Sequence, residues 1–343
     1  MPPIISIIIP CYNAENYIDT CFQSLLRQTI GFEKLCIIMV DDCSTDHTWD
    51  KLLSYEKEYP DNVIVIQNEI NTRQGGARDI GVTYCPTPYF AFLDADDWIE
   101  DTMYEKLYQK MTDCPCDFVM CQHSRDIQGE VPQIIPAPHI PVGLYDISTE
   151  DMRRKVILEA PFGCSAWDKL FSKNYWDQNQ LRFPWHLAYE DIPYGCALSL
   201  TAKRVCVIED SLYHYVVNPA STVLAKDRPY HYDMFTASDI AWELICSYPD
   251  RHLYDAELKF NYMLHGYYGC MKMLFLRFTK LDYDRYVSLR NTILQRVPDY
   301  RQNPYLTTKV TEQYSLLLTL LDTQVTPAQL QQVAEAFRKL AIG

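Results

Sequence analysis

The chain has 343 residues, 48% of them hydrophobic, which is enough apolar area for one large domain or for a domain with a smaller second part. A formal net charge of −14 disfavours nucleic acid as a partner, because nucleic-acid affinity depends on clustered lysine and arginine. The longest apolar runs fall far short of the ~20 residues that a membrane-spanning helix requires. The sequence therefore predicts a globular protein without a transmembrane segment.

The cysteines and the first residues both indicate the cytoplasm. The 13 cysteines are odd in number and scattered through the chain, as expected of reduced core residues and not of a disulfide framework. A strand pattern begins within a few residues of Met1, which leaves no room for a secretion signal. We therefore expect a cytoplasmic protein.

Short β-rich runs alternate with helical periodicity in the first third of the chain. Apolar residues recur at helical spacing over 18–26 and again over 103–111. This alternation is typical of parallel βαβ units, and hence of an α/β fold. The predicted strands are Ile4–Ile9, Leu35–Val40, Val63–Gln67, Tyr89–Leu93 and Phe118–His123.

The remaining chain divides into a loop, a mixed segment and a helical part. Residues 124–148 are rich in proline and lack periodicity, so we interpret them as a long surface loop that joins two halves. A helix over 149–159 is predicted next, and later two strands, Val205–Glu209 and Leu212–Val217. The pattern then becomes wholly helical. Helices are expected near 230–247, 255–278, 282–296, 308–322 and 326–341.

Three nucleotide or phosphate folds are excluded by the motifs after the strands. The first strand ends in "PCYNAEN" without the G-x-G-x-x-G of a dinucleotide fold. The motif "GGARDIG", residues 75–81, lacks the lysine and hydroxyl of a P-loop. A phosphatase-like aspartate nucleophile would follow the first strand, whereas the acidic motif of this chain follows the fourth.

Three aspartates follow the fourth predicted strand in "AFLDADDW", residues 91–98. Two carboxylates separated by one residue at a strand end can point to the same side, where a divalent cation relieves their repulsion. Mg²⁺ or Mn²⁺ fits, because such an ion keeps open positions for substrate phosphates. Either Asp94, Asp96 or Asp97 holds such a metal, or the motif is a solvated turn that caps the next helix.

A second strand also ends in paired carboxylates, in "VDDCSTD", residues 40–46. In an open parallel sheet, ligands bind beyond the carboxyl ends of the strands. We therefore expect the following carboxylates to converge there with "PCYN": Asp41, Asp42, Asp94 and Asp96. A carboxylate at this place can accept a hydrogen bond from the imide N–H of uracil, and Tyr12 can stack on the base. The sequence thus predicts one crevice addressed by three strand ends.

These motifs together resemble those of the inverting family 2 glycosyltransferases with the GT-A fold, of the non-processive bacterial type. The stretches that carry the resemblance lie in the family's order over about residues 4–225: "IIIPCYNAENYI", "VDDCSTDHT", "NTRQGGARDIG", "FLDADDW", "WDKLF" and "YEDIPY". The resemblance implies a Rossmann-like α/β domain that binds a nucleotide-diphospho-sugar. It implies that Asp96 and Asp94 approach the metal and that Arg78 holds Asp94 and the nucleotide. The donor-binding residues that it implies are Pro10, Tyr12, Asn13, Glu15, Asp41, Asp42, Arg78, Asp94 and Ala95.

Two residues depart from the family pattern. Arg73 stands where the family often has glycine, and Asp79 where it usually has asparagine. Local contacts to the donor are therefore expected to differ, although neither change removes a group that the chemistry requires. For Arg73, a solvated loop position and a phosphate contact are equal alternatives.

The motif "YEDIPY" supplies the candidate base. Inverting transfer needs a carboxylate that deprotonates the acceptor hydroxyl, across the sugar from the leaving diphosphate. Glu190 and Asp191 lie at an apparent helix start. The resemblance implies that Asp191 is the base, and we assign Glu190 an acceptor-orienting role. The alternative is that both are favourable charges at a helix N-terminus.

Four more residues of the second half are candidates for the site. His214 is either a third metal ligand, a hydrogen-bond donor to the diphosphate, or a packed strand histidine. Trp167 and Asp168 are expected in the wall near the transferred sugar. Trp185 either faces the acceptor, stacking on a sugar ring, or packs on the surface.

We therefore expect a metal-dependent, inverting enzyme that moves one sugar from a nucleotide-sugar, with UDP-sugars favoured, to a glycan or lipid-linked acceptor in cell-surface polysaccharide synthesis. Its cofactor would be Mn²⁺ or Mg²⁺. The alternatives are a sugar-nucleotide nucleotidyltransferase, which should carry a basic glycine-rich loop that this chain lacks, and a noncatalytic nucleotide-sugar binding protein.

The expected domains are a catalytic domain, 1–225, and a helical C-terminal region, 226–343. Within the first, the donor half covers about 1–123 and the acceptor half about 149–225. The C-terminal helices either pack on the catalytic domain or form the face of a homodimer. A lipid-linked acceptor would bring the protein to the inner face of the membrane as a peripheral protein.

Overall fold

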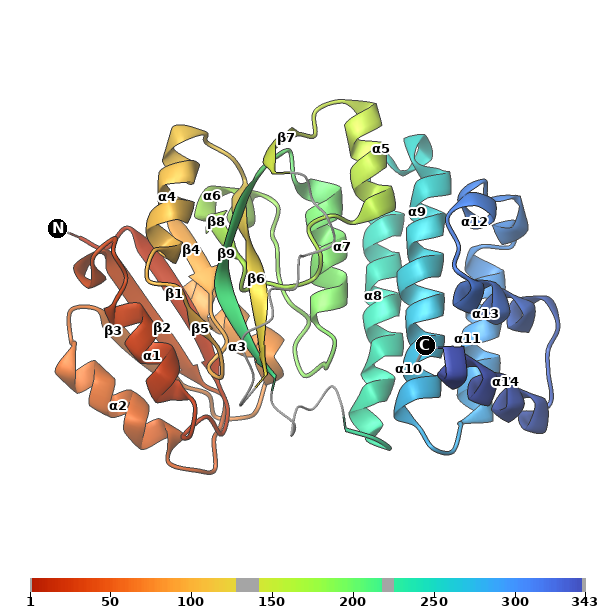
Figure 1. Cartoon of the computed structure of the whole chain (residues 1–343), viewed down its shortest axis with the longest axis horizontal. Coiled ribbons are helices and arrows are strands. Elements are labelled where there is room, and N and C mark those ends of the chain that lie inside the picture. The colour runs from red at the N-terminus through yellow and green to blue at the C-terminus, as the bar shows by residue number, and fades with distance from the viewer. Residues whose placement is uncertain (1, 128–141, 218–224, 341–343) are drawn as a thin grey trace. The chain divides into compact units, whose positions relative to one another are not determined.

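The structure is a computed structural model that describes residues 2–127, 142–217 and 225–340. The chain forms two compact units, both drawn in Figure 1. The first comprises Met1–Arg153 and Pro161–Asn218, and the second comprises Arg154–Ala160 and Pro219–Gly343. Residues 154–160 thus group with the helical second unit, although they precede the expected boundary near residue 225.

Four parallel strands form the N-terminal half of the sheet in the first unit, in the order β3-β2-β1-β4. The sequence predicts all four strands to within two residues. β1 and β2 are buried along their whole length, as central strands of a sheet with two covered faces must be. The expected α/β class is confirmed. The strands are β1 (Ile5–Cys11), β2 (Leu35–Asp41), β3 (Val63–Gln67) and β4 (Tyr89–Phe92).

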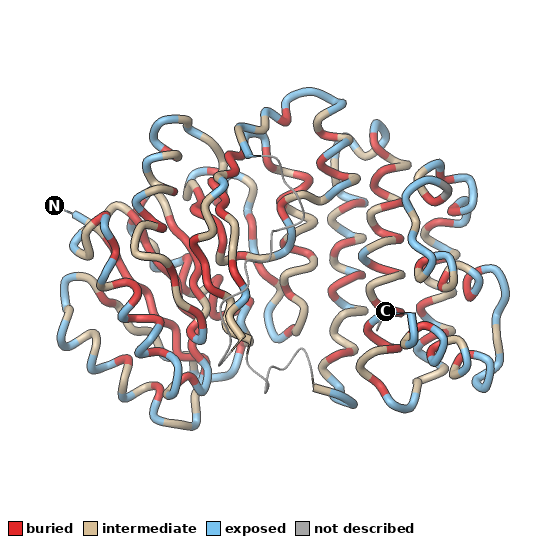
Figure 2. The backbone as a smooth tube through the Cα atoms, in the orientation of Figure 1, coloured by how far each residue is buried: buried red, intermediate tan, exposed pale blue. Residues whose placement is uncertain are grey.

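Helices cover both faces of these strands: α1 (Ile18–Leu26), α2 (Thr48–Glu58), α3 (Arg73–Thr83) and α4 (Met103–Asp113). Ile5, Ile7 and Ile9 belong to the core that β1 forms with α1 and α4. Ile8 points to the other face, where α3 crosses. A Cβ on Gly81 would lie 2.3 Å from Ile8 Cγ2, so only glycine lets the helix approach the strand so closely. Figure 2 shows how strongly burial is concentrated in these strands.

Beyond β4 the sheet continues with mixed pairing, in the order β4-β8-β6-β9-β5, and β7 pairs with β9 off this path. The two strands predicted over 205–217 are one strand, β9, whose register against β6 shifts between Met120 and His123. This irregularity accommodates the polar residues that interrupt the apolar pattern. The bounds are β5 (Trp98–Ile99), β6 (Phe118–Ile127), β7 (Gly143–Asp146), β8 (Lys169–Ser172) and β9 (Arg204–Val217).

The expectation of one long loop over 124–148 is wrong at both ends. β6 extends to Ile127 and β7 occupies Gly143–Asp146, because both strands find backbone partners on β9. Residues 128–141 lie outside the described part of the chain. Three helices follow along the chain: α5 (Glu150–Glu159), most of which groups with the second unit, and α6 (Lys173–Gln178) and α7 (Asp191–Thr201) of the first unit. The Glu190–Asp191 pair thus lies at a helix start, as predicted.

The second unit is helical throughout its described residues after 225. A π-helical turn, Met263–Tyr268, joins α9 to α10, so 255–277 is continuous helix, as predicted. Nowhere in the described ranges is a helix both long and apolar enough to cross a membrane. The helices are α8 (Asp233–Ser247), α9 (Asp255–Tyr262), α10 (Gly269–Arg277), α11 (Tyr283–Arg296), α12 (Tyr305–Thr308), α13 (Glu312–Asp322) and α14 (Pro327–Leu340).

Candidate active site

Three strand ends meet at one edge of the sheet. Cys11 at the end of β1 pairs with Asp41 at the end of β2. β1 and β4 pair in parallel, so Pro10 and Asp94 each lie two residues beyond the last matched pair and at the same level. Ala95, next to Asp94, is buried. The predicted convergence of carboxylates at this edge therefore follows from the observed register.

The three aspartates of the acidic motif have different surroundings. Asp97 is buried, and both of its oxygens are used: Oδ2 accepts from the Tyr213 hydroxyl at 2.5 Å and Oδ1 from the Val216 amide at 2.8 Å. Asp96 is exposed, and Asp94 is partly exposed. Because Asp97 is committed to holding β9, Asp94 and Asp96 are the two carboxylates available to a cation.

The electrostatics of this pair suit a divalent ion. The pKa of Asp96 is raised to about 6, first because the surrounding protein desolvates the carboxylate, although the residue reaches solvent, and second because Asp94 carries like charge. No group of three or more His, Cys, Asp or Glu side chains that could enclose a metal occurs within the described ranges. Two carboxylates nevertheless fit Mg²⁺ or Mn²⁺, whose remaining positions are commonly filled by water and substrate phosphates.

The carboxylates after β2 have distinct roles. Asp42 Oδ1 accepts from both the amide and the hydroxyl of Thr72, at 2.7 and 2.8 Å, and so anchors the start of α3. Asp41 is fully buried; its Oδ2 accepts from Gln67 at 3.3 Å, whereas its Oδ1 has no partner among the described residues. A buried oxygen without a donor is costly. Tyr12, which follows the Cys11 that pairs with Asp41, is 54% exposed.

Asn13 and Glu15 organise the loop after β2. Asn13 Oδ1 accepts from the Thr45 amide at 2.8 Å, and Glu15 Oε2 from the His47 amide at 2.9 Å. The backbone is left-handed at Asn13 and at Cys43, with φ of 50° and 67°. Such conformations persist where surrounding contacts enforce them, and they cluster at ligand sites. Asn13 and Glu15 therefore fix the shape of the loop after β2.

Arg78 joins the acidic motif to the start of α7. Its guanidinium is 5% exposed and donates to Glu190 Oε1 at 2.7 Å and to Asp94 Oδ1 at 2.8 Å. Burial alone would lower the pKa of Arg78, but the two carboxylates outweigh it and raise the pKa above its ordinary value. The contact between Arg78 and Asp94 that the resemblance implies is present, and Glu190 shares it.

Glu190 and Asp191 differ in solvent exposure and in whether they form an ion pair. Glu190 is buried and paired with Arg78, while Asp191 is partly exposed. The pKa of each is raised, chiefly because burial disfavours the charged form. For Asp191, a hydrogen bond from the Cys164 thiol and the charge of Arg78 oppose the rise. An accessible carboxylate with a raised pKa is a stronger base than an ordinary one, so the geometry suits Asp191 for proton abstraction.

Both ring nitrogens of His214 have protein partners. Nδ1 lies 2.8 Å from Ser124 Oγ and 3.1 Å from Asp126 Oδ2, and Nε2 lies 2.9 Å from Glu100 Oε1. The ring also stacks on Trp98, with 3.4 Å between centroids. Of the alternatives, the packed strand histidine describes these contacts, whereas metal ligation would require one partner to leave. Its partners lie about a hundred residues away along the chain, so motif spacing carries no signal for them.

Two residues expected in the sugar-proximal wall are turned into the protein. Asp168 is fully buried; its carboxylate receives Lys169 Nζ at 2.7 Å and Ser165 Oγ at 2.8 Å. The expectation that Asp168 lies in the wall near the transferred sugar, as an acceptor-site residue, is therefore wrong, because its carboxylate is buried and paired with a buried lysine. Trp167 is half-buried and stacks on Tyr213, with 4.1 Å between centroids. It supports the tyrosine that holds the acidic motif.

Trp185 is the expected acceptor residue that does reach solvent. Its side chain belongs to the segment before α7 and is 49% exposed. The indole Nε1 donates to Asp79 Oδ2 at 3.1 Å. The carboxylate of Asp79, whose departure from the family pattern was expected to alter donor contacts, thus points from α3 toward the segment before α7.

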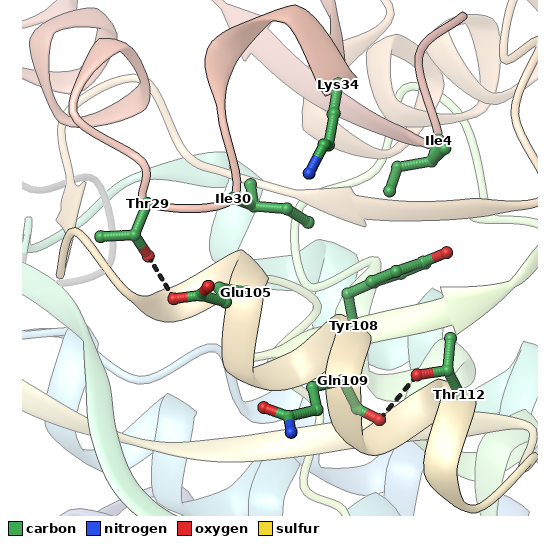
Figure 3. Close-up of a pocket in the computed structure, with 8 residues that line it drawn as sticks. All are labelled: Ile4, Thr29, Ile30, Lys34, Glu105, Tyr108, Gln109 and Thr112. Carbon is green, nitrogen blue, oxygen red and sulfur yellow. Dashed lines mark hydrogen bonds between the residues drawn. The ribbon is translucent and has the colours of Figure 1, made fainter. Parts of the chain in front are cut away.

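A pocket of about 290 Å³, drawn in Figure 3, lies elsewhere. It is lined by Ile4 and Lys34, which precede β1 and β2, and by side chains of α4 such as Glu105, which accepts from the Thr29 hydroxyl. These residues mark the amino ends of the parallel strands. Since ligands of open α/β sheets bind at the carboxyl ends, we do not assign this pocket to the site.

Comparisons with known proteins agree with this geometry. Residues 6–172 match the sequence model of glycosyl transferase family 2. The chain is 28% identical over 235 residues to the uncharacterized glycosyltransferase EpsJ of Bacillus subtilis, covering 67% of this chain and 65% of EpsJ. It is 31% identical over 215 residues to the poly(ribitol-phosphate) beta-glucosyltransferase of Bacillus spizizenii, covering 62% and 32%. The crystal structure of S. aureus TarS 1–349 with UDP matches with a TM-score of 0.73 at 20% identity, over 98% of this chain and 91% of that one.

The fold and the site therefore define a GT-A type α/β protein with a helical C-terminal region. Residues 6–172 of the chain form a domain that matches glycosyl transferase family 2. The chain spans 65% of the length of EpsJ and 32% of the length of the B. spizizenii protein, and so corresponds to part of each.

Proposed function

We propose that this chain transfers a single sugar from a nucleotide-sugar to an acceptor hydroxyl, with inversion at the anomeric carbon. The observation that carries the proposal is the chain of contacts Asp94–Arg78–Glu190, which joins the acidic motif to the residue before Asp191, a partly exposed carboxylate. One buried guanidinium thus contacts one carboxylate of the pair proposed for a cation and one of the pair proposed for the acceptor.

In the proposed reaction, Asp191 accepts the proton of the acceptor hydroxyl while that oxygen bonds to the anomeric carbon. The bond from this carbon to the diphosphate oxygen breaks on the opposite face, and the nucleoside diphosphate leaves with the electron pair. Glu190, fixed by Arg78, orients the acceptor. A divalent cation held by Asp94 and Asp96 would, when bound, offset the charge of the departing diphosphate.

A uridine nucleotide is the donor that we favour. The unpaired Oδ1 of Asp41 suits the imide N–H of uracil, and Tyr12 offers an exposed ring beside it. TarS, which shares the fold, was crystallised with UDP. The name of the B. spizizenii relative supports a cell-wall polymer as the acceptor, within the wider class of glycan or lipid-linked acceptors. Peripheral association with the inner face of the membrane and dimerisation through the C-terminal helices stay predictions.

The proposal is tested by incubating the full chain with a panel of radiolabelled UDP- and GDP-sugars and Mn²⁺, and measuring release of the nucleotide and transfer of label. We expect at least one UDP-sugar to be turned over. Asp191→Asn, which removes the base but keeps the shape, should lower kcat by at least about 100-fold. Asp61→Asn, on the exposed surface after α2, is the matched control. Turnover by Asp191→Asn at the rate of that control would refute the base assignment.

A further inference from the structure

The segment before α7 carries an aromatic face that is open to solvent yet held in place. Trp185 is 49% exposed. A lone exposed aromatic side chain is ordinary on protein surfaces and by itself implies no ligand. Here, however, the polar edge of the indole is bound by a buried carboxylate of a different element, α3. A fixed ring with one free face is what a stacking ligand requires.

The anchor of the indole is Asp79. This residue is 5% exposed; its Oδ2 accepts from Trp185 Nε1 at 3.1 Å, and both oxygens lie 3.2 Å from the Phe183 amide that donates to them. Burial raises the pKa of Asp79 to about 6, although these two hydrogen bonds and the charge of Arg182 oppose the rise. Burying a carboxylate is costly, and at this position the cost is offset by hydrogen bonds to the segment of Trp185 alone.

The indole and the residue before it pack against two glycines of α3. A Cβ on Gly76 would lie 3.3 Å from Trp185 Cγ, and one on Gly75 would lie 2.7 Å from the backbone carbonyl that precedes Trp185. The next residue, His186, donates its amide to the Thr72 carbonyl at 2.9 Å, in a left-handed conformation with φ of 57°. Because these two positions of α3 have no side chains, the segment of Trp185 can approach the helix closely. The indole is held by this packing and by the hydrogen bond from its N–H to Asp79.

The position of this surface relative to the catalytic pair decides what it faces. The same Cβ on Gly75 would lie 3.0 Å from Glu190 Cγ, so the segment of Trp185 and the residue that orients the acceptor rest on one glycine turn. The carboxylate with the unpaired oxygen, Asp41, belongs instead to the end of β2. The segment of the indole is therefore tied to the catalytic pair through Gly75, and it also contacts Thr72, which Asp42 holds.

We propose that Trp185 is a stacking platform for a pyranose ring of the acceptor and that Asp79 is the positioning residue that holds it. The inference rests on the proposed function and names the acceptor chemistry of that site. One face of a hexopyranose presents C–H groups, which pack well against an indole. Holding the ring in advance lowers the entropy lost on binding, so the buried anchor contributes to acceptor affinity without touching the sugar.

The test measures binding, because binding needs no turnover. Methyl α- and β-hexopyranosides are titrated by ligand-observed NMR against the full chain saturated with UDP and Mn²⁺, and UDP affinity is measured separately by calorimetry. The variants are Trp185→Ala, Trp185→Phe, Asp79→Ala, Asp79→Asn and the double variant Asp79→Ala/Trp185→Phe. Tyr84→Ala is the matched control, since Tyr84 is also on the α3 side and is 54% exposed.

We expect wild type and the Tyr84 control to bind at least one pyranoside equally, and Trp185→Ala to bind it about 3- to 10-fold more weakly. Asp79→Ala should weaken pyranoside binding more in the wild-type background than with Trp185→Phe, because the phenyl ring has no N–H to lose while the Phe183 amide loses its acceptor in both backgrounds. Asp79→Asn, which keeps one carbonyl oxygen as an acceptor, should lose less pyranoside affinity than Asp79→Ala. UDP affinity should not change.

The inference is overturned if no pyranoside binds wild type, if Trp185→Ala binds as wild type does, or if Asp79→Ala has the same effect in both backgrounds. A parallel loss of UDP affinity would show a general structural role and overturns it too. Lack of donor turnover by wild type would count instead against the proposed function, because pyranoside binding is measured independently.

Discussion

Removing Arg78 should destabilise the first unit, and more at neutral than at acid pH. Its guanidinium is 5% exposed and lies 2.8 Å from Asp94 and 2.7 Å from Glu190. Methionine has a similar length but no charge, so Arg78→Met leaves two carboxylates without their cation. Breaking a buried ion pair in this way typically costs about 3–5 kcal/mol, and we expect a loss in that range at pH 7.

The pH dependence follows from the carboxylates that remain. Burial already raises the pKa of Glu190. Without Arg78, the folded-state pKa of Glu190 should lie further above its unfolded value. The folded state then binds more protons than the unfolded state between those two values, so its stability falls as pH rises through them. More of Glu190 is protonated at pH 5 than at pH 7, so the loss caused by Arg78→Met should be smaller at pH 5.

Urea unfolding of the metal-free protein at pH 5 and pH 7 measures both losses. Arg153→Met is the matched control, because Arg153 is also buried, at 8% exposure, but donates to the carbonyls of Ser199 and Ala202 at 2.8 and 2.6 Å and to no carboxylate. The loss of unfolding free energy caused by Arg153→Met should be the same at pH 5 and at pH 7. Equal losses for Arg78→Met at the two pH values, or a loss below about 1 kcal/mol at pH 7, would refute the reasoning.

Three further outcomes are expected. Asp96→Asn should raise the Mn²⁺ concentration for half-maximal transfer by about 10-fold or more, and an unchanged metal titration would contradict its role. Asp41→Asn should weaken UDP about 10-fold in calorimetry, because an amide nitrogen can face the imide donor; wild-type affinity would argue against the assignment. In wild type, the pKa of about 6 for Asp79 means that stability falls by up to about 3 kcal/mol as pH rises from 4 to 7. Asp79→Asn should reduce this change of stability with pH by that amount. Identical dependences of unfolding free energy on pH for the variant and wild type would contradict the prediction.

Local patterns along the chain were sufficient for the parallel half of the fold. Val63–Gln67 has the same bounds in sequence and structure. The strand over 204–217 was harder, because polar residues interrupt its apolar pattern while backbone pairing to β6 continues past them. β7 had no periodicity of its own to reveal it; its partner on β9 is about sixty residues further along the chain.

The candidate site shows the same division. That Asp41 and Asp94 share one edge follows from the order of parallel strands, which motif spacing predicts. That Asp168 is buried against Lys169 does not follow from any pattern, since a charged pair of neighbours ordinarily faces water.

The sequence by itself determined the four parallel strands, their polar ends and the family, because these depend on residue periodicity and on motifs a few residues long. Only the tertiary structure decided which carboxylates keep a free oxygen. Asp97 is occupied by Tyr213 and Val216, more than a hundred residues away, and Asp96 is not. Likewise, Asp79 acquires its role from Trp185 only when the folded chain brings them together. Hydrogen bonds act over about 3 Å in space, and separation along the chain does not reveal which groups come that close.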